Sequence, residues 1–173
     1  RPKCIIFDMD GVIFDTEHVA IRVWADVAAE FGIRDIETVY PRCIGGNAAH
    51  SMAILREAYG SDFPFEPFQM RTRAVYLERY EQFGLPLKPG AVEIVRWLHE
   101  QGIPTAIASS TRIDTVTREL RDAGLYDFFH AVIGGDMVSR SKPAPDIFLA
   151  AAERLHAKPE NCFVIEDSFN GIR

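Results

Sequence analysis

Residues 3–12 read KCIIFDMDGV. A short apolar run, residues 3–7, ends at Asp8, and a second aspartate, Asp10, stands two residues later. Apolar runs of this length are typical of strands that are buried on both faces in the middle of a parallel sheet. The stretch therefore predicts a central strand with two carboxylates at its carboxyl end, where the ligands of open α/β sheets bind.

The rest of the chain alternates further apolar runs with amphipathic helical patterns. Alternation of strand and helix is typical of an α/β fold with a doubly wound parallel, Rossmann-like sheet. The expected strands cover 105–109, 131–134 and 162–165, and the expected helices cover 91–101, 113–123 and 144–156.

One long segment, residues 17–86, interrupts this alternation because it shows helical patterns and no convincing strand. We expect a helical cap domain there, inserted after the first strand into an α/β core of residues 1–16 and 87–173. Such an insert is placed to cover the carboxyl edge of the sheet. Four strands without a closing helix and edge strand also suggest that the C-terminal end of the core is missing. The expected cap helices cover 19–31, 47–59 and 66–83.

The composition excludes several classes of protein. Of the 173 residues, 47% are hydrophobic and 25% are charged, which is a globular balance. A net charge of −6 argues against a nucleic-acid binder, which needs a concentrated basic face. No apolar stretch approaches the roughly 18–20 residues of a membrane span, and no signal peptide is visible. We expect a cytoplasmic monomer that binds neither nucleic acid nor membrane.

The cysteines and tryptophans are expected to serve packing. Cys4, Cys43 and Cys162 are far apart, odd in number and form no CxxC motif, so each is interpreted as a small packed residue. This usage suits a reducing compartment. Trp24 and Trp97 fall within helical patterns and are interpreted as core residues.

Asp8 and Asp10 can divide the work of phosphoryl transfer. Two carboxylates this close repel each other, so one pKa should rise unless a cation lies between them. One aspartate can then attack phosphorus while the other gives a proton to the leaving oxygen. Taken alone, the pair could equally belong to an ordinary loop or to a metal site.

Three further polar sites follow predicted strands or precede a helix. Ser109, with Ser110 beside it, supplies hydroxyls after the second strand, or an N-cap for the next helix. Lys142 lies in a polar loop and is either a phosphate ligand or a solvated charge. Glu166 and Asp167 follow the fourth strand, where they could cap a helix or hold a hard divalent cation. Together the four sites supply a nucleophile, an acid, phosphate donors and metal ligands at one edge of one sheet.

Four ordered segments of the chain resemble the motifs of the haloacid dehalogenase superfamily, specifically its phosphatases and β-phosphoglucomutase-like members. The resemblance implies that Asp8 forms an aspartyl-phosphate and that Asp10 is the general acid and then the base. It also implies that Ser109, Ser110 and Lys142 bind phosphate. Mg2+ would be held by Asp8, Asp167, Glu166 and the backbone carbonyl of Asp10. The segments are Asp8–Val12, Ser109–Thr111, Lys142–Asp146 and Glu166–Ser168.

The resemblance leaves several activities to weigh. Asp10 argues against a dehalogenase, which needs neither metal nor acid, and the absence of lysine from residues 17–87 argues against a phosphonoacetaldehyde hydrolase. A β-phosphoglucomutase carries a histidine where this chain has Ala20, and an arginine after the cap-loop glycine where residues 45–48 read GGNA. We therefore expect a Mg2+-dependent phosphatase acting on a small phosphorylated metabolite such as a sugar phosphate.

Two alternatives and three substrate-contact residues stay open. The alternatives are a β-phosphoglucomutase-type mutase and a non-catalytic regulator that binds phosphate. Arg42, Asn47 and His50 lie in or beside the cap loop and are candidates for substrate contact, or are exposed surface.

Overall fold

The structure is a computed structural model of the chain. It describes residues 3–44, 48–169 and 171–172. The chain divides into two compact units, Arg1–Thr16 with Gly84–Arg173, and Glu17–Phe83. None of the helices within the described residues combines the length and apolar character that a membrane crossing needs.

The first unit is built on a four-stranded sheet with the strand order β3-β2-β1-β4. Every neighbouring pair in it is parallel, which confirms the predicted doubly wound α/β fold. Because the strands are parallel and β1 is internal, the loops that follow β1, β2 and β4 meet at one edge. The strands are β1 (Cys4–Phe7), β2 (Thr105–Ala108), β3 (Ala131–Ile133) and β4 (Cys162–Ile165).

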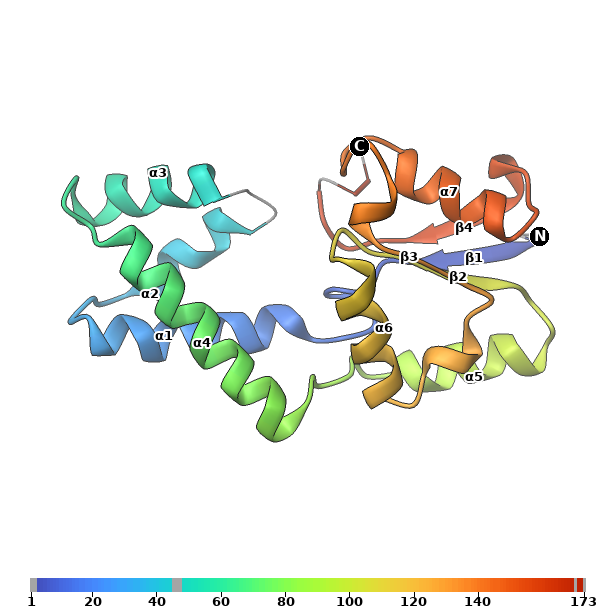
Figure 1. The fold of residues 1–173 in the computed structure, drawn as a ribbon, viewed down its shortest axis with the longest axis horizontal. Coiled ribbons are helices and arrows are strands. Elements are labelled where there is room, and N and C mark those ends of the chain that lie inside the picture. The colour runs from blue at the N-terminus through green and yellow to red at the C-terminus, as the bar shows by residue number, and fades with distance from the viewer. Residues whose placement is uncertain (1–2, 45–47, 170, 173) are drawn as a thin grey trace. The chain divides into compact units, whose positions relative to one another are not determined.

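Helices cover both faces of this sheet, with α5 and α6 on one face and α7 on the other (Figure 1). Successive side chains of a strand point to opposite faces. Phe7 accordingly packs in one cluster with Val95 and Val116, and Ile6 packs in another with Ile147. The helices are α5 (Ala91–Glu100), α6 (Ile113–Asp122) and α7 (Asp146–Arg154), with short 3-10 turns η2 (Tyr126–Phe128), η3 (Gly135–Met137) and η4 (Pro159–Asn161).

The second unit is helical and has an aromatic core of its own. Trp24, Phe31 and Phe63 surround Phe68, with ring centroids 5.4, 5.8 and 5.4 Å from it. The elements are α1 (Thr16–Glu30), α2 (Ile36–Val39), η1 (Tyr40–Cys43), α3 (Ala48–Tyr59) and α4 (Phe65–Phe83). The sequence did not predict α2 and η1, because four residues are too few to display a helical period.

The expectation that Trp97 is a core residue is wrong. Trp97 is 48% exposed, whereas its neighbours Val95 and Leu98 on α5 are buried. A helix turns by about 100° per residue, so the side chain next to Leu98 points away from the sheet. Trp24, in contrast, packs against the core of the helical unit.

Candidate active site

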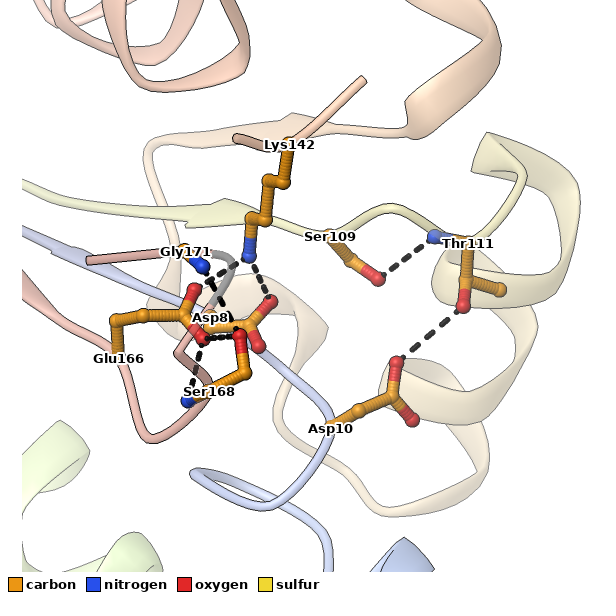
Figure 2. A network of polar contacts seen from close by, with 8 residues as sticks. All are labelled: Asp8, Asp10, Ser109, Thr111, Lys142, Glu166, Ser168 and Gly171. Carbon is orange, nitrogen blue, oxygen red and sulfur yellow. Dashed lines mark hydrogen bonds and ion pairs between the residues drawn. The ribbon is translucent and has the colours of Figure 1, made fainter. Parts of the chain in front are cut away.

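Polar side chains from four loops of the first unit come together beyond the carboxyl ends of the strands (Figure 2). Asp8 and Asp10 follow β1, and Ser109 follows β2. Lys142 comes from the loop before α7, and Glu166 follows β4. The four sequence segments singled out as candidates therefore contribute to one network.

Lys142 lies between two carboxylates. Its Nζ atom is 2.8 Å from Oδ1 of Asp8 and 2.6 Å from Oε2 of Glu166. The three side chains are only 7%, 9% and 2% exposed, respectively. The Lys142 ammonium also lies 5.0 Å from the centroid of the Phe148 ring, which adds a cation–π contact. Lys142 is therefore a buried, fixed positive charge rather than a solvated one.

The two carboxylates beside Lys142 respond differently to burial. Burial raises the pKa of Asp8 to about 6, although Lys142 acts in the opposite direction. Burial also opposes ionisation of Glu166, but hydrogen bonds from Lys142 and Ser168 hold its pKa below the ordinary value. The backbone N–H and the hydroxyl of Ser168 both donate to Oε1 of Glu166, at 2.9 and 2.5 Å. Glu166 is thus the firmly ionised partner of Lys142.

Asp10 is held by two threonine hydroxyls. The hydroxyl of Thr111 donates to Oδ2 of Asp10 at 3.3 Å, and Thr16 also hydrogen-bonds the same carboxyl group. Burial nevertheless raises the pKa of Asp10, which favours a carboxyl group that carries a proton. Thr16 was not predicted from the sequence, although its place at the start of the first helix, six residues after Asp10, was a usable signal.

Ser109 and Ser110 differ sharply in exposure. Ser109 is fully buried, and its hydroxyl accepts a hydrogen bond from the backbone N–H of Thr111 at 3.1 Å. Ser110 is exposed. Neither serine caps α6, because Asp136 from η3 accepts the N–H of Ile113 at 2.8 Å. The N-cap alternative for these serines is therefore wrong.

Three carboxylates could hold a cation. Asp8, Glu166 and Asp167 each offer an oxygen, and these atoms lie within 4.8 Å of one another. Gly11, at φ +76°, makes room for this cluster, since a Cβ atom there would lie 1.9 Å from Oδ2 of Asp167. An all-oxygen donor set with excess negative charge suits a hard divalent cation such as Mg2+.

The candidate substrate residues lie in the helical unit. Arg42 donates to Glu57 at 2.6 Å, and Nε2 of His50 is 3.2 Å from the backbone oxygen of Arg42. Asn47 lies outside the described residues. Arg42 and His50 do not line the hollow of this unit that opens between α1, α3 and α4.

A hollow of about 480 Å³ in the helical unit opens between α1, α3 and α4. Its wall is mostly apolar, and Arg73 is the only charged side chain among the described residues that line it. Other lining residues include Ala20, Trp24, Ser51, Phe68 and Tyr76.

The chain is similar to several known proteins. Residues 2–173 match the family of haloacid dehalogenase-like hydrolases. The chain is 34% identical, over 98% of its length and 78% of the relative's, to a phosphorylated carbohydrates phosphatase of Thermotoga maritima. It is 29% identical, over 98% of its length and 77% of the relative's, to a β-phosphoglucomutase of Bacillus subtilis.

The chain is also similar to a solved structure of the same family. A hydrolase of this family from Deinococcus radiodurans, with bound phosphate and sodium, superposes with a TM-score of 0.84 at 30% identity. The match covers 98% of this chain and 74% of that one.

Proposed function

The chain belongs to the haloacid dehalogenase-like hydrolases, and from this premise we propose that it is a Mg2+-dependent phosphatase of a small phosphorylated metabolite, such as a sugar phosphate. The observation that carries the proposal is the buried contact of Lys142 with both Asp8 and Glu166. A buried ammonium beside a buried carboxylate nucleophile offsets the repulsion between that nucleophile and an anionic substrate.

In the first half-reaction, a carboxylate oxygen of Asp8 attacks phosphorus and the ester oxygen departs. Asp10 gives its proton to that oxygen, so an alcohol leaves and an aspartyl-phosphate remains on Asp8. The raised pKa of Asp10 supports this role, because the carboxyl group must carry a proton near neutral pH. Hydrogen bonds from Thr16 and Thr111 orient it.

In the second half-reaction, water attacks the same phosphorus atom. Asp10, now ionised, takes a proton from the water, and the Asp8 carboxylate is released with inorganic phosphate. We assign Lys142, Ser109 and Ser110 to the phosphoryl oxygens. Asp8, Asp167, Glu166 and the backbone carbonyl of Asp10 would hold Mg2+, which supplies positive charge against the phosphoryl oxygens when it is bound.

The helical unit is assigned the role of a cap that selects the leaving group. We also propose that the enzyme works as a cytoplasmic monomer. Family members with related sequences include a β-phosphoglucomutase, so a mutase is the second candidate. Ala20 lines the hollow of the helical unit without offering an imidazole, and Arg42 is paired with Glu57. Both observations favour hydrolysis over a mutase cycle.

The test is release of inorganic phosphate from a panel of sugar phosphates and nucleotides, with Mg2+ and with EDTA. Asp8→Asn should abolish release while the protein stays folded, because an amide cannot form an acyl phosphate. Asp10→Asn should slow release by about 10²–10⁴-fold. Asp127→Asn, an exposed aspartate in η2, is the matched control and should leave the rate unchanged.

Two outcomes would contradict the proposal. An active Asp8→Asn enzyme would exclude the aspartyl-phosphate. Conversion of β-glucose 1-phosphate to glucose 6-phosphate without net phosphate release would establish the mutase instead.

A further inference from the structure

Cys4 and Cys162 lie side by side at the end of the sheet opposite to the candidate active site. Cys4 begins β1 and Cys162 begins β4, and the two residues are paired in the register of these strands. Their Sγ atoms are 3.0 Å apart, although 158 positions separate them in the sequence. Both are free thiols.

This arrangement is close to what a disulfide requires. Neighbouring strands of a sheet lie about 4.7–4.9 Å apart, within the roughly 4.4–6.8 Å that bridged Cα atoms span. Bonded sulfur atoms are about 2.05 Å apart, so the two Sγ atoms need to approach by about 1 Å. A movement of this size can be made by the side chains with a small shift of the strand ends.

We propose that Cys4 and Cys162 are a thiol-oxidation site that closes to an intramolecular disulfide on reaction with a low-molecular-weight disulfide such as oxidised glutathione. This inference does not depend on the proposed enzyme activity. It departs from the interpretation of both cysteines as packing residues, because the sequence alone does not show that they are neighbours.

The two thiols differ in access to solvent, and this sets the order of events. Cys162 is half-buried and can meet an oxidant, whereas Cys4 is 1% exposed and is reached only by its neighbour. Burial also raises the pKa of the Cys4 thiol to about 12, which disfavours the Cys4 thiolate, so the accessible Cys162 is assigned the first attack.

The exchange balances in two steps. The Cys162 thiolate attacks one sulfur of glutathione disulfide, forming a mixed disulfide and releasing a glutathione thiolate. The Cys4 thiol gives its proton to a departing thiolate and attacks Sγ of Cys162, which displaces the second glutathione. The two cysteines lose two electrons and two protons, and one glutathione disulfide becomes two glutathione thiols.

The cross-link should stabilise the fold and leave the candidate active site alone. It joins β1 and β4 across a very long stretch of chain, which restricts the unfolded state strongly. Asp8, Glu166 and Asp167 lie at the other ends of the same strands. Cys43 is buried in the helical unit, where it contacts the backbone oxygen of Val39, so it serves as an internal control.

The experiment treats the folded chain with oxidised glutathione at pH 8 and maps its peptides by mass spectrometry without reduction. We expect a linked peptide pair containing Cys4 and Cys162, loss of two hydrogen atoms from the intact mass, and a melting temperature raised by several degrees that dithiothreitol reverses. Free Cys4 and Cys162, stable mixed disulfides on them, or links through Cys43 or between chains would overturn the proposal. An unchanged melting temperature in the linked protein would refute the claimed stabilisation.

Single variants separate the two steps. Cys4→Ala should trap one glutathione on Cys162, because the resolving thiol is gone. Cys162→Ala should leave Cys4 unmodified, because the buried thiol is not reached directly. Cys43→Ala should form the Cys4–Cys162 link as the parent does, and failure of that variant to link would count against the proposed pair.

Discussion

At the scale of single residues, one ammonium group organises the site. Lys142 contacts Asp8 and Glu166 while all three side chains are almost fully buried. Without it, two buried carboxylates would face each other, and burial and mutual repulsion would both favour protonation of Asp8. A protonated Asp8 is a poor nucleophile. In the proposed mechanism, the ammonium therefore serves the ionisation of Asp8 as well as the binding of an anionic substrate.

Glu119 is a buried acid that has no part in the proposed mechanism. It lies on the inner side of α6 with 6% of its surface exposed. Burial raises its pKa from an ordinary 4.5 to about 7, and the nearby charge of Asp10 acts in the same direction. The folded protein thus holds a proton on Glu119 over a pH range in which the unfolded chain releases it.

Glu119→Gln should change stability in a pH-dependent way. The pKa of Glu119 is higher in the folded chain than in the unfolded chain. Its contribution to the free energy of unfolding is therefore complete below pH 4.5 and is lost as the pH rises through about 7. Glutamine cannot ionise, so the free energy of unfolding of the variant should exceed that of the parent by on the order of 2–3 kcal/mol at pH 8 and by little at pH 5. Urea denaturation at the two pH values measures this.

The matched control for Glu119→Gln is Glu153→Gln, an exposed position on α7. The effect of Glu153→Gln on the free energy of unfolding should be the same at pH 5 and at pH 8. An equal effect of Glu119→Gln at pH 5 and pH 8 would mean that Glu119 is not titrating between them.

Sequence reasoning reached the charged residues of the network but not the residues that support them. Asp8, Lys142 and Glu166 could be predicted because each stands at a predicted strand end or in a loop beside a helix. Glu119 escaped because the helix was recognised from its apolar stripe of Val116 and Leu120, and that stripe does not show that a glutamate between them is buried. Which charges contact one another depends on packing between distant segments, and no local pattern records it.

At the scale of elements, the start of α6 depends on a neighbouring segment. Asp136 from η3 accepts the N–H of Ile113, and that hydrogen bond lowers the pKa of Asp136. Gly135 lies so close that a Cβ atom there would be 2.2 Å from the backbone oxygen of Ser110. The loop that carries Ser109 is therefore held between β2 and η3.

Asp136→Ala should loosen this loop. We expect a melting temperature lower by a few degrees and a higher KM for phosphate esters, because the start of α6 loses its acceptor. Asp136→Asn keeps an acceptor oxygen and should restore most of both properties. Thermal unfolding and steady-state kinetics check this; equal losses in the two variants would show that the charge matters more than the hydrogen bond.

Elements with a clear apolar pattern could be predicted from the sequence, whereas bounds that depend on neighbouring residues could not. All four strands lie within one residue of their predicted bounds, because each appears in the sequence as an uninterrupted apolar run. Burial of both faces explains this run in β1 and β2, whereas Phe163 and Val164 of β4 are exposed. Helix α7 begins at Asp146 rather than at residue 144, because Pro145 disfavours a helical conformation at the residue before it.

At the scale of the whole molecule, the acidic charge of the chain acts together with the carboxylate cluster. The net charge is −6, and Asp8, Glu166 and Asp167 add local repulsion to it. A cation at the cluster would relieve the local repulsion, and it would bind the folded chain only, because unfolding disperses the three carboxylates. Any divalent salt would also screen the overall charge, so a general effect must be separated from a site.

Mg2+ should therefore raise the melting temperature of the parent chain, by an amount corresponding to about 2.7 kcal/mol at 100 times the dissociation constant. Calorimetry with Mg2+, with EDTA and with NaCl of equal ionic strength measures the effect. Asp167→Asn and Asp127→Asn each remove one negative charge, but only the first alters the cluster. If the site is real, Asp167→Asn loses the Mg2+ response and Asp127→Asn keeps it. If overall screening were the cause, both variants would respond alike, and NaCl would reproduce the shift.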